Sequence, residues 1–164
     1  MDPSDLVEIH AIERLKYRYL RCVDLKLWDD IAGCFTDDAT ASYGGGTVEL
    51  KGREAIVEYL RSSLGSTDFL TSHKAHNPEI DLTGAREARA VWALDDVVIA
   101  KAFDITVRGA AYYDDRYVKV GDDWLISHTG YRRVYEEVQP RSGAGAPSLT
   151  ADWWDTDGRS SLNG

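Results

Sequence analysis

The sequence predicts an α+β domain: a cone-shaped α+β barrel in which a curved antiparallel sheet wraps around a long N-terminal helix and encloses an internal pocket. Two observations predict it. Apolar residues recur at helical spacing in the first part of the chain, and after Gly65 they alternate as in strands. Helices followed by a run of strands are typical of α+β domains, whereas α/β domains alternate the two. The 164 residues, 43% of them apolar, suffice for one domain with a sizeable core.

The first helix is predicted from Asp5 to Lys26. Asp5 is a suitable N-cap, because its carboxylate can accept a backbone hydrogen bond, and Glu8 follows three residues later. Apolar residues at three- and four-residue steps then form the buried stripe of an amphipathic helix: Ile9, Ile12, Leu15, Tyr19, Cys22 and Val23.

Shorter elements follow this helix. We expect a second, short helix at 28–35 and a third helix at 53–64. Between them, strands at 39–43 and 47–50 are separated by the glycine turn 44–46.

The rest of the domain is predicted to consist of strands. Ile80 and Leu82 alternate with Glu79 and Asp81, as in a strand with one buried face. A Gly-Asp-Asp sequence at 121–123 suits a hairpin turn. The predicted strands are 70–82, 87–100, 103–107, 110–120 and 124–135.

A single domain, 1–139, is expected, followed by a C-terminal tail, 140–164. The tail begins with a stretch rich in Gly, Ser, Ala and Pro, which is typical of flexible connectors. Trp153 and Trp154 come later, and leaving two indole rings in water is unfavourable. The tail is therefore expected to pack on the domain or on a neighbouring subunit.

Charge and composition exclude several classes of function. The net charge of −9, from 19 basic and 28 acidic residues, would repel phosphates, so neither nucleic acid nor an anionic membrane is an expected partner. No apolar run approaches the roughly 20 residues of a membrane span, and the first residues lack the pattern of a secretion signal. Cys22 and Cys34 could form one disulfide, but Cys22 lies in the buried stripe. Free thiols in a reducing cytoplasm are the favoured interpretation.

Tyr19 and Asp24 are candidate acid–base groups near the end of the first helix. Five residues separate them, which is about 140° around a helix and about 7.5 Å along it. They share a cavity only if the helix ends inside it; otherwise Tyr19 is a core aromatic and Asp24 an ordinary carboxylate. Because a carboxylate is electrostatically unfavourable at a helix C-terminus, Asp24 merits a functional interpretation.

His73 and His76 are candidates for a general base, although both could be surface residues of a polar strand. A bulge at Asn77 and Pro78 would reset which side chains face inward, so strand parity alone does not choose between the two histidines. Two histidines without a third ligand at suitable spacing do not predict a metal site.

Asp96 falls on the apolar face of the strand 87–100, beside Trp92 and Leu94. An ionised carboxylate on that face needs a partner. A histidine across the cavity would serve, so that Asp96 orients the ring and stabilises its protonated form. We expect His73 and Asp96 to lie within hydrogen-bond distance; an edge position facing water is the alternative.

Tyr43 and Arg133 are candidate pocket residues. Tyr43 ends a strand just before three glycines and could reach into the pocket. Arg133 shares a strand face with Tyr131 and could bind a substrate anion, although an ion pair with Glu136 or Glu137 is the favoured interpretation.

These motifs resemble the SnoaL-like members of the nuclear-transport-factor-2-like superfamily, over roughly residues 8–138. The resemblance is closest to the bile-acid 7α-dehydratases and extends more distantly to scytalone dehydratase and hexachlorocyclohexane dehydrochlorinase. It implies a cone of sheet and helices around a pocket. The matching motifs are Tyr19, Arg21-Cys22, Asp24 and Trp28-Asp29; Ser42-Tyr43; His73 to Ile80; Trp92 to Asp96; and Gly130 to Glu137.

The resemblance also implies roles for single residues. His73 would be the catalytic base and Tyr19 the assisting acid, with His76 mainly structural. Leu25 stands where the bile-acid enzymes tend to have glycine, and the loop at 44–46 and the tail differ, so bile acids are not assumed as the substrate. The implied catalytic residues are Tyr19, Asp24, His73 and Asp96, and the implied substrate-binding residues are Tyr43, Trp92, Tyr113 and Arg133.

These features predict a cofactor-independent dehydratase, a lyase that removes water from a polycyclic or steroid-like carbonyl compound by acid–base catalysis. An isomerase or cyclase of the same fold is one alternative, and a non-catalytic protein that binds small molecules is another. The expected partners are a small hydrophobic substrate and further copies of the chain. A homotrimer is expected first and a dimer second, because similar proteins form trimers.

Overall fold

The computed structural model describes residues 2–163. Its strands form a six-stranded sheet with the order β2-β1-β6-β5-β4-β3. The strands are β1 (Phe35–Tyr43), β2 (Val48–Lys51), β3 (Phe69–Gly84), β4 (Glu87–Ala100), β5 (Ile105–Val120) and β6 (Asp123–Pro140). The helical elements are α1 (Pro3–Asp24), α2 (Trp28–Ala32), α3 (Arg53–Leu64), η1 (Lys101–Phe103), α4 (Trp153–Thr156) and η2 (Ser161–Asn163).

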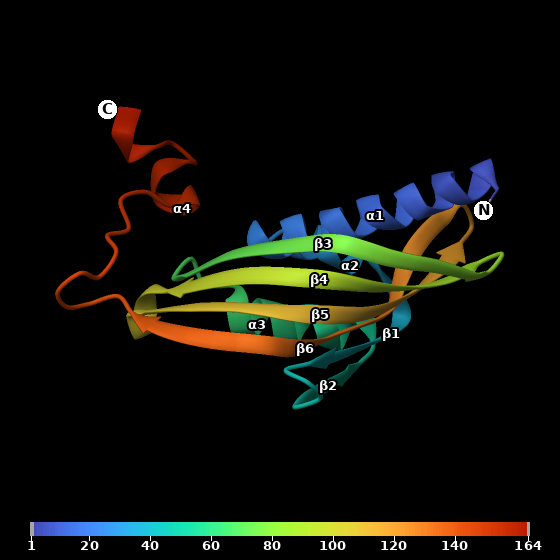
Figure 1. Cartoon of the computed structure of the whole chain (residues 1–164), viewed down its shortest axis with the longest axis horizontal. Helices are drawn as coiled ribbons and strands as arrows, with labels where there is room; N and C mark the ends of the chain where they lie inside the picture. The colour runs from blue at the N-terminus through green and yellow to red at the C-terminus, as the bar shows by residue number, and fades with distance from the viewer. Residues whose placement is uncertain (1, 164) are drawn as a thin grey trace.

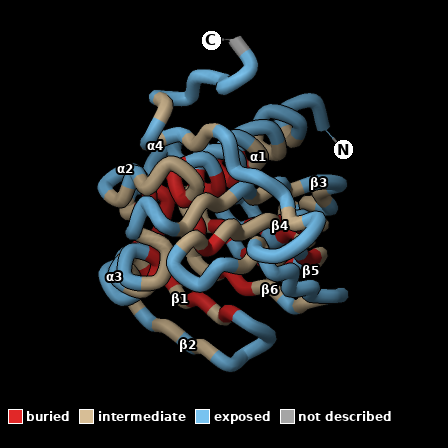
Figure 2. The backbone as a smooth tube through the Cα atoms, turned by 90° about the vertical axis from the view of Figure 1, so that its left-hand side faces the viewer, coloured by how far each residue is buried: buried red, intermediate tan, exposed pale blue. Residues whose placement is uncertain are grey.

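The helices of the domain pack on one face of the sheet. Figure 1 shows α1 running along β3, with α3 behind the middle strands; α1 contacts β3 and β6, and α3 packs on β1. Figure 2 shows the buried segments gathered between these helices and the strands. The predicted α+β fold, in which a curved sheet accompanies a long N-terminal helix, is confirmed.

One strand pair corrects the prediction of a wholly antiparallel sheet. β1 runs parallel to β6, with Phe35 opposite Ile126, whereas the other neighbouring strands are antiparallel. The two strands are far apart in the chain, and the apolar pattern within a strand identifies its buried face but not its neighbour.

The helix α1 begins and ends earlier than predicted. Asp2, rather than Asp5, is the N-cap: its carboxylate accepts the backbone N–H of Ser4 at 2.9 Å, and the Asp5 carboxylate accepts that of Asp2 at 2.8 Å. Pro3 fits the first helical position, where a missing N–H leaves no bond unmade. Because the helix ends at Asp24, that carboxylate lies at the C-terminus of α1, next to β3.

The predicted apolar faces form the core. Both Cys22 and Cys34 are buried free thiols, as the sequence favours. Within residues 2–163, no helix has the length and apolar content that a membrane crossing requires. The buried side chains of α1 include Ile12, Leu15, Tyr19, Cys22 and Val23, and those of β4 include Ala88, Ala90, Trp92, Leu94 and Asp96.

The tail contacts the domain near the end of α1. Asp152 forms an ion pair with Lys101 at 3.0 Å, and the ring of Trp154 lies 4.8 Å from Lys26 Nζ. Lys26 Nζ also donates to the backbone oxygens of Leu64 and Phe69. The tail therefore lies against a lysine that ties α1 to the end of α3 and the start of β3, while its contact with a neighbouring subunit stays a prediction.

Candidate active site

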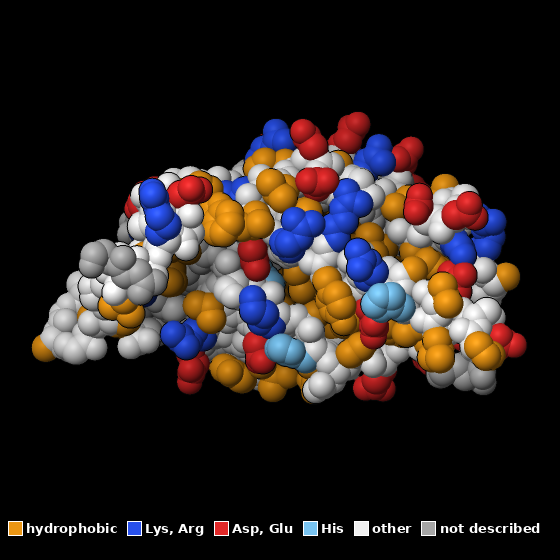
Figure 3. Space-filling model, turned by 90° about the horizontal axis from the view of Figure 1, so that it is seen from above, with side chains coloured by type: hydrophobic (Ala, Val, Ile, Leu, Met, Phe, Trp, Pro, Cys, Tyr) orange, Lys and Arg blue, Asp and Glu red, His pale blue; other side chains and the backbone are white. Residues whose placement is uncertain are grey.

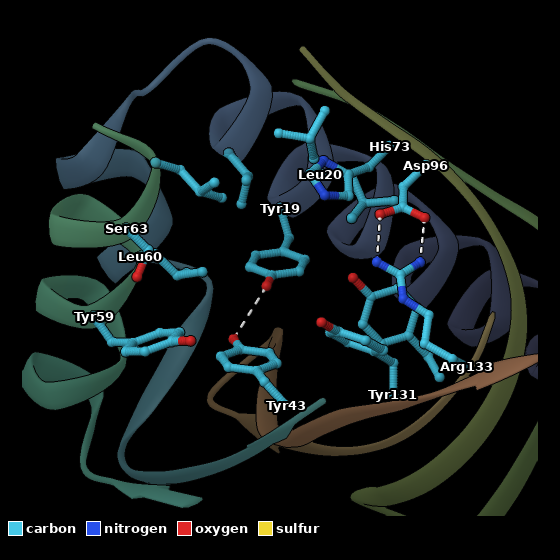
Figure 4. Close-up of a pocket in the computed structure, with 14 residues that line it drawn as sticks. Tyr19, Leu20, Tyr43, Tyr59, Leu60, Ser63, His73, Asp96, Tyr131 and Arg133 are labelled. Carbon is cyan, nitrogen blue, oxygen red and sulfur yellow. Dashed lines mark hydrogen bonds and ion pairs between the residues drawn. The ribbon is translucent and has the colours of Figure 1, made fainter. Parts of the chain in front are cut away.

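A cavity of about 170 Å³, here called the inner cavity, lies between α1, α3 and the sheet (Figure 4). Its wall combines aromatic rings with a few polar groups. The lining residues are Tyr19, Leu20 and Val23 from α1; Tyr43 from β1; Tyr59, Leu60, Ser63 and Leu64 from α3; His73 from β3; Asp96 and Val98 from β4; Tyr113 from β5; and Tyr131 and Arg133 from β6.

His73 is held by Asp24, the last residue of α1. Its Nδ1 atom lies 2.7 Å from Asp24 Oδ1, and its backbone N–H donates to Oδ2 at 3.0 Å. Thr71 Oγ1 donates to Asp24 Oδ1 at 2.8 Å. Because an ionised carboxylate only accepts hydrogen bonds, the neutral form of the ring carries its proton on Nδ1 and presents a lone pair at Nε2. Within the described chain, Nε2 makes no hydrogen bond, which leaves it available to a substrate.

The prediction that His73 forms a hydrogen bond with Asp96 is wrong. The two residues face each other across the β3–β4 ladder and both line the inner cavity. However, both oxygens of Asp96 accept from Arg133. The carboxylate that contacts the histidine ring is Asp24, because the end of α1 meets β3 at His73.

A bulge in β3 turns His73 inward. Asn77 has a φ angle of 46°, and the pairing with β4 shifts between His76 and Glu79. The His73 side chain is 13% exposed, whereas that of His76 is 47% exposed and lies 3.4 Å from Asp95. The bulge anticipated near Asn77 is thus present, and it selects His73 as the cavity histidine.

Arg133 and Asp96 form a two-pronged ion pair in the cavity wall. Arg133 Nη2 donates to Oδ2 at 2.9 Å and Nη1 donates to Oδ1, and this contact raises the pKa of the guanidinium. Gly109 makes room for it, since a Cβ there would lie 2.6 Å from Nη1. The strands predicted at 103–107 and 110–120 are accordingly one strand, β5, in which the glycine permits a close approach instead of a break.

The favoured pairing of Arg133 with Glu136 is only a secondary contact. Arg133 Nε lies 3.3 Å from Glu136 Oε2, but this buried N–H makes no hydrogen bond among the described residues. The guanidinium also lies 5.1 Å from the ring of Tyr131. Arg133 is therefore fixed by Asp96, with one buried donor left unused.

The phenols are positioned by contacts with one another. The Tyr19 and Tyr43 hydroxyls are 3.3 Å apart (Figure 4), Tyr43 stacks on Tyr59 at 5.7 Å, and Tyr113 packs edge-on against Tyr131 at 5.9 Å. Burial raises the pKa of Tyr19, Tyr43 and Tyr113 above its ordinary value. These groups are therefore protonated hydrogen-bond donors at neutral pH.

A buried polar network beside the tyrosines was not predicted. Lys16 Nζ donates to Asp115 at 2.7 Å, and both side chains are fully buried. Thr129 and Tyr117 donate to the same carboxylate at 2.7 and 2.8 Å. Lys16 Nζ also lies 3.3 Å from the centre of the Tyr113 ring. Desolvation lowers the pKa of Lys16, while the nearby carboxylate opposes that shift.

Trp92 belongs to this network and does not line the inner cavity. Its Nε1 donates to Tyr117 at 3.1 Å, and its side chain is fully buried. A signal for the network exists in the sequence. Lys16 falls within the buried stripe of α1, and Asp115 alternates with Tyr113 and Tyr117 along β5, so two opposite charges occupy faces that should be apolar.

The structure gathers most of the predicted site residues around one cavity. Asp24 contacts His73 from outside it, and Tyr59 and Ser63 of α3 are additional lining residues that the motifs did not indicate. No group of three or more His, Cys, Asp or Glu side chains in residues 2–163 is arranged to hold a metal ion. The predicted residues in the wall are Tyr19, Tyr43, His73, Asp96, Tyr113 and Arg133.

Comparison with known proteins gives consistent matches. The family model of the SnoaL-like domain matches residues 4–130. A candidate scytalone dehydratase from Novosphingobium aromaticivorans superposes with a TM-score of 0.77 at 26% identity, covering 90% of this chain and 100% of that one. A type 3 hexachlorocyclohexane dehydrochlorinase from Novosphingobium barchaimii has a TM-score of 0.77 at 20% identity, covering 91% and 99%, and bears on the fold alone. A candidate cyclase of Gibberella zeae is 28% identical over 137 residues, 76% of this chain and 89% of that protein.

Proposed function

The chain belongs to the SnoaL-like family, and on this premise we propose that it is a cofactor-independent dehydratase acting on a ring compound with a carbonyl group. The observation that carries the proposal is the His73–Asp24 contact at the wall of a cavity lined by phenols. A base and acidic donors around one cavity are what elimination of water requires. The motif resemblance to bile-acid 7α-dehydratases and the structural similarity to a candidate scytalone dehydratase support the same reaction.

In the first step, His73 Nε2 takes a proton from the carbon next to the carbonyl group, or from a carbon conjugated with it. The C–H electron pair moves into an enolate, whose negative charge rests on oxygen. Asp24 stabilises the imidazolium that forms, because its carboxylate stays hydrogen-bonded to Nδ1.

In the second step, the enolate electrons form the new C=C bond while the C–O bond to the hydroxyl breaks. The departing oxygen takes the proton held by His73 and leaves as water, so the protein returns to its starting state. Tyr19 and Tyr43, which burial keeps protonated, donate hydrogen bonds to the enolate oxygen or to the leaving oxygen.

Arg133 and Tyr113 would bind the substrate. Asp96 neutralises the guanidinium, so this part of the wall favours a neutral polar group and does not demand an anion. The Tyr113 ring offers an apolar surface for a flat substrate. Trp92 would act only indirectly, through Tyr117.

The size of the inner cavity constrains the substrate. A cavity of about 150 Å³ accepts benzene, whereas drug-sized ligands occupy pockets of about 300–1,000 Å³. At about 170 Å³, the inner cavity accommodates one ring. A steroid-like or other polycyclic substrate would therefore insert only its reacting ring and leave the remainder outside.

An isomerase or cyclase is the second candidate. The same base and phenols can move a proton between two carbons without loss of water. The sequence similarity to a candidate cyclase favours keeping this reaction in view.

Turnover of a substrate set tests the proposal. The set contains ring compounds with a hydroxyl β to a carbonyl, and a 3-oxo-Δ4 steroid whose hydroxyl is on the carbon next to the acidic γ carbon of the enone. All are incubated in D₂O, and the products are followed by mass spectrometry. A dehydratase yields a product lighter by one water. An isomerase yields a product without that loss, carrying deuterium from the solvent. Binding without either change would refute the enzymatic proposal and favour a small-molecule-binding protein.

A further inference from the structure

A second hollow lies on the other side of His73. It measures about 400 Å³, larger than the inner cavity, and we call it the outer groove. Leu20 and His73 line both hollows, so the outer groove and the inner cavity adjoin at these two side chains. The lining residues of the outer groove are Tyr17, Leu20, Arg21, Asp24 and Leu25 from α1 and the turn after it, and His73, Lys74, Ala75 and His76 from β3.

Two cations of the outer groove lack an acidic partner. Among residues 2–163, Arg21 forms no ion pair, and Lys74 Nζ donates only to the neutral Ser72 hydroxyl at 3.1 Å. Asp24 is occupied by its contacts with Thr71 and His73. Figure 3, which views the molecule from the side of α1 and β3, shows several Lys and Arg side chains beside histidine and hydrophobic side chains, with single acidic side chains between them. The charged side chains that line the groove are thus Arg21 and Lys74 against Asp24, so the groove is locally positive in a chain of net charge −9.

We propose that the outer groove binds a carboxylate-bearing substituent of the substrate whose reacting ring enters the inner cavity. The inference rests on the proposed function and names the substrate class: a neutral ring with an acidic arm. Arg21 and Lys74 supply charge-assisted hydrogen bonds to the carboxylate, while Leu25 and Ala75 contact the hydrocarbon that links it to the ring.

The division of charge between the two hollows supports this orientation. In the inner cavity, the guanidinium of Arg133 is already neutralised by Asp96, so an anion gains little there. In the outer groove, the cations are unpaired and their side chains reach solvent, where an acidic group keeps part of its hydration. An acidic ligand would therefore enter ring first.

A matched pair of probes tests the inference: neutral 4-phenylphenol and 4′-hydroxybiphenyl-4-carboxylate, titrated into the protein by calorimetry at low salt. We expect the carboxylate to bind roughly tenfold more tightly than the neutral compound, with the advantage falling as salt rises. The double variant Arg21→Gln/Lys74→Gln should lose this advantage and keep the affinity for 4-phenylphenol. The double variant Arg14→Gln/Arg89→Gln, at two exposed arginines outside the groove, makes the same change in net charge and should keep the advantage.

The outcomes separate the inference from the proposed function. Equal binding of both probes, or an advantage that survives the double variant, would overturn the acidic-arm site while leaving the ring site intact. If neither probe binds, the ring site itself fails, and the inference fails with it.

Discussion

Asp24 is the carboxylate that holds His73. Its two oxygens accept three hydrogen bonds, from Thr71 Oγ1 and from the ring and backbone of His73. An asparagine has a single accepting oxygen, so its NH₂ group would face either the ring N–H or the backbone N–H of His73, donor against donor. The substitution therefore keeps the shape of the side chain, but it either breaks a hydrogen bond of His73 or moves the ring proton to Nε2, where it removes the basic lone pair.

We predict that Asp24→Asn lowers kcat by about 10²-fold or more, because the ring loses its stabilising charge and no longer has its tautomer fixed by a carboxylate. Asp96→Asn should act mainly on KM, since Asp96 holds Arg133 and does not contact His73. Steady-state kinetics on a converted substrate, with thermal melting of both variants, check this. A loss of kcat as large in Asp96→Asn as in Asp24→Asn would contradict the assignment.

The motifs identify these residues but not their contacts. The inward face of β4 correctly predicts that Asp96 is buried and needs a partner, and a histidine is a reasonable choice. The partner is Arg133 of β6 instead, since Gly109 of the intervening strand β5 lets the guanidinium reach across to β4. A close approach between two strands depends on their register, which the sequence of one strand does not contain.

At the scale of elements, α1 and β5 are joined by the buried pair Lys16 and Asp115. We predict that Lys16→Met destabilises the fold by about 3–5 kcal/mol, because it leaves an unpaired charge in the core. Adding Asp115→Asn should recover part of that loss, since an amide oxygen still accepts from Thr129. Urea unfolding of the single and double variants measures the coupling, and simple additivity of the two losses would argue against it.

The tail offers a prediction about pH. The backbone N–H of Asp155 and the Lys101 ammonium lower the pKa of Asp152 from 3.8 to about 2. The lowered carboxyl pKa stabilises both the cap of α4 and the ion pair with Lys101 above pH 3.8, and this stabilisation disappears as pH falls through about 2. The indole NMR signal of Trp154 should therefore keep its docked position until well below pH 3.8.

Two variants make the tail experiment specific. Asp152→Asn should release the tail at neutral pH, whereas Asp155→Asn, at a more exposed carboxylate 3.9 Å from Lys101, should not. A Trp154 signal that ignores Asp152→Asn would mean that this ion pair does not hold the tail.

The sequence predicts the buried faces of the helices and strands better than it predicts their ends and their neighbours. The stripe of α1 and the alternation of β4 identify the core faces, because burial dictates their periods. The starting cap of α1 and the parallel pairing of β1 with β6 were missed. The position of the cap depends on which of two acidic residues, Asp2 or Asp5, reaches the free N–H groups. The neighbours of a strand depend on the folding of the whole chain.

At the scale of the whole molecule, assembly stays a prediction. Exposed apolar side chains occur on both faces of β5 and β6, namely Tyr112, Val134, Tyr135 and Val138, and exposed apolar surface favours association. We predict a homotrimer, with a mass in light scattering of three times the 18.3 kDa chain. Val134→Asp should weaken assembly, and Leu6→Asp, at an exposed leucine of α1, should not. A wild-type mass of one chain would refute the prediction.

The central claim is that His73 removes a proton from carbon. The most direct measurement is the rate at which the protein exchanges the acidic C–H of a converted substrate with D₂O, followed by NMR. Loss of a general base costs about 10²–10⁴ in rate, so His73→Ala should slow exchange by that factor. His10→Ala, at an exposed histidine far along α1, should exchange at the wild-type rate. Wild-type exchange in His73→Ala, with its fold intact by thermal melting, would contradict the account.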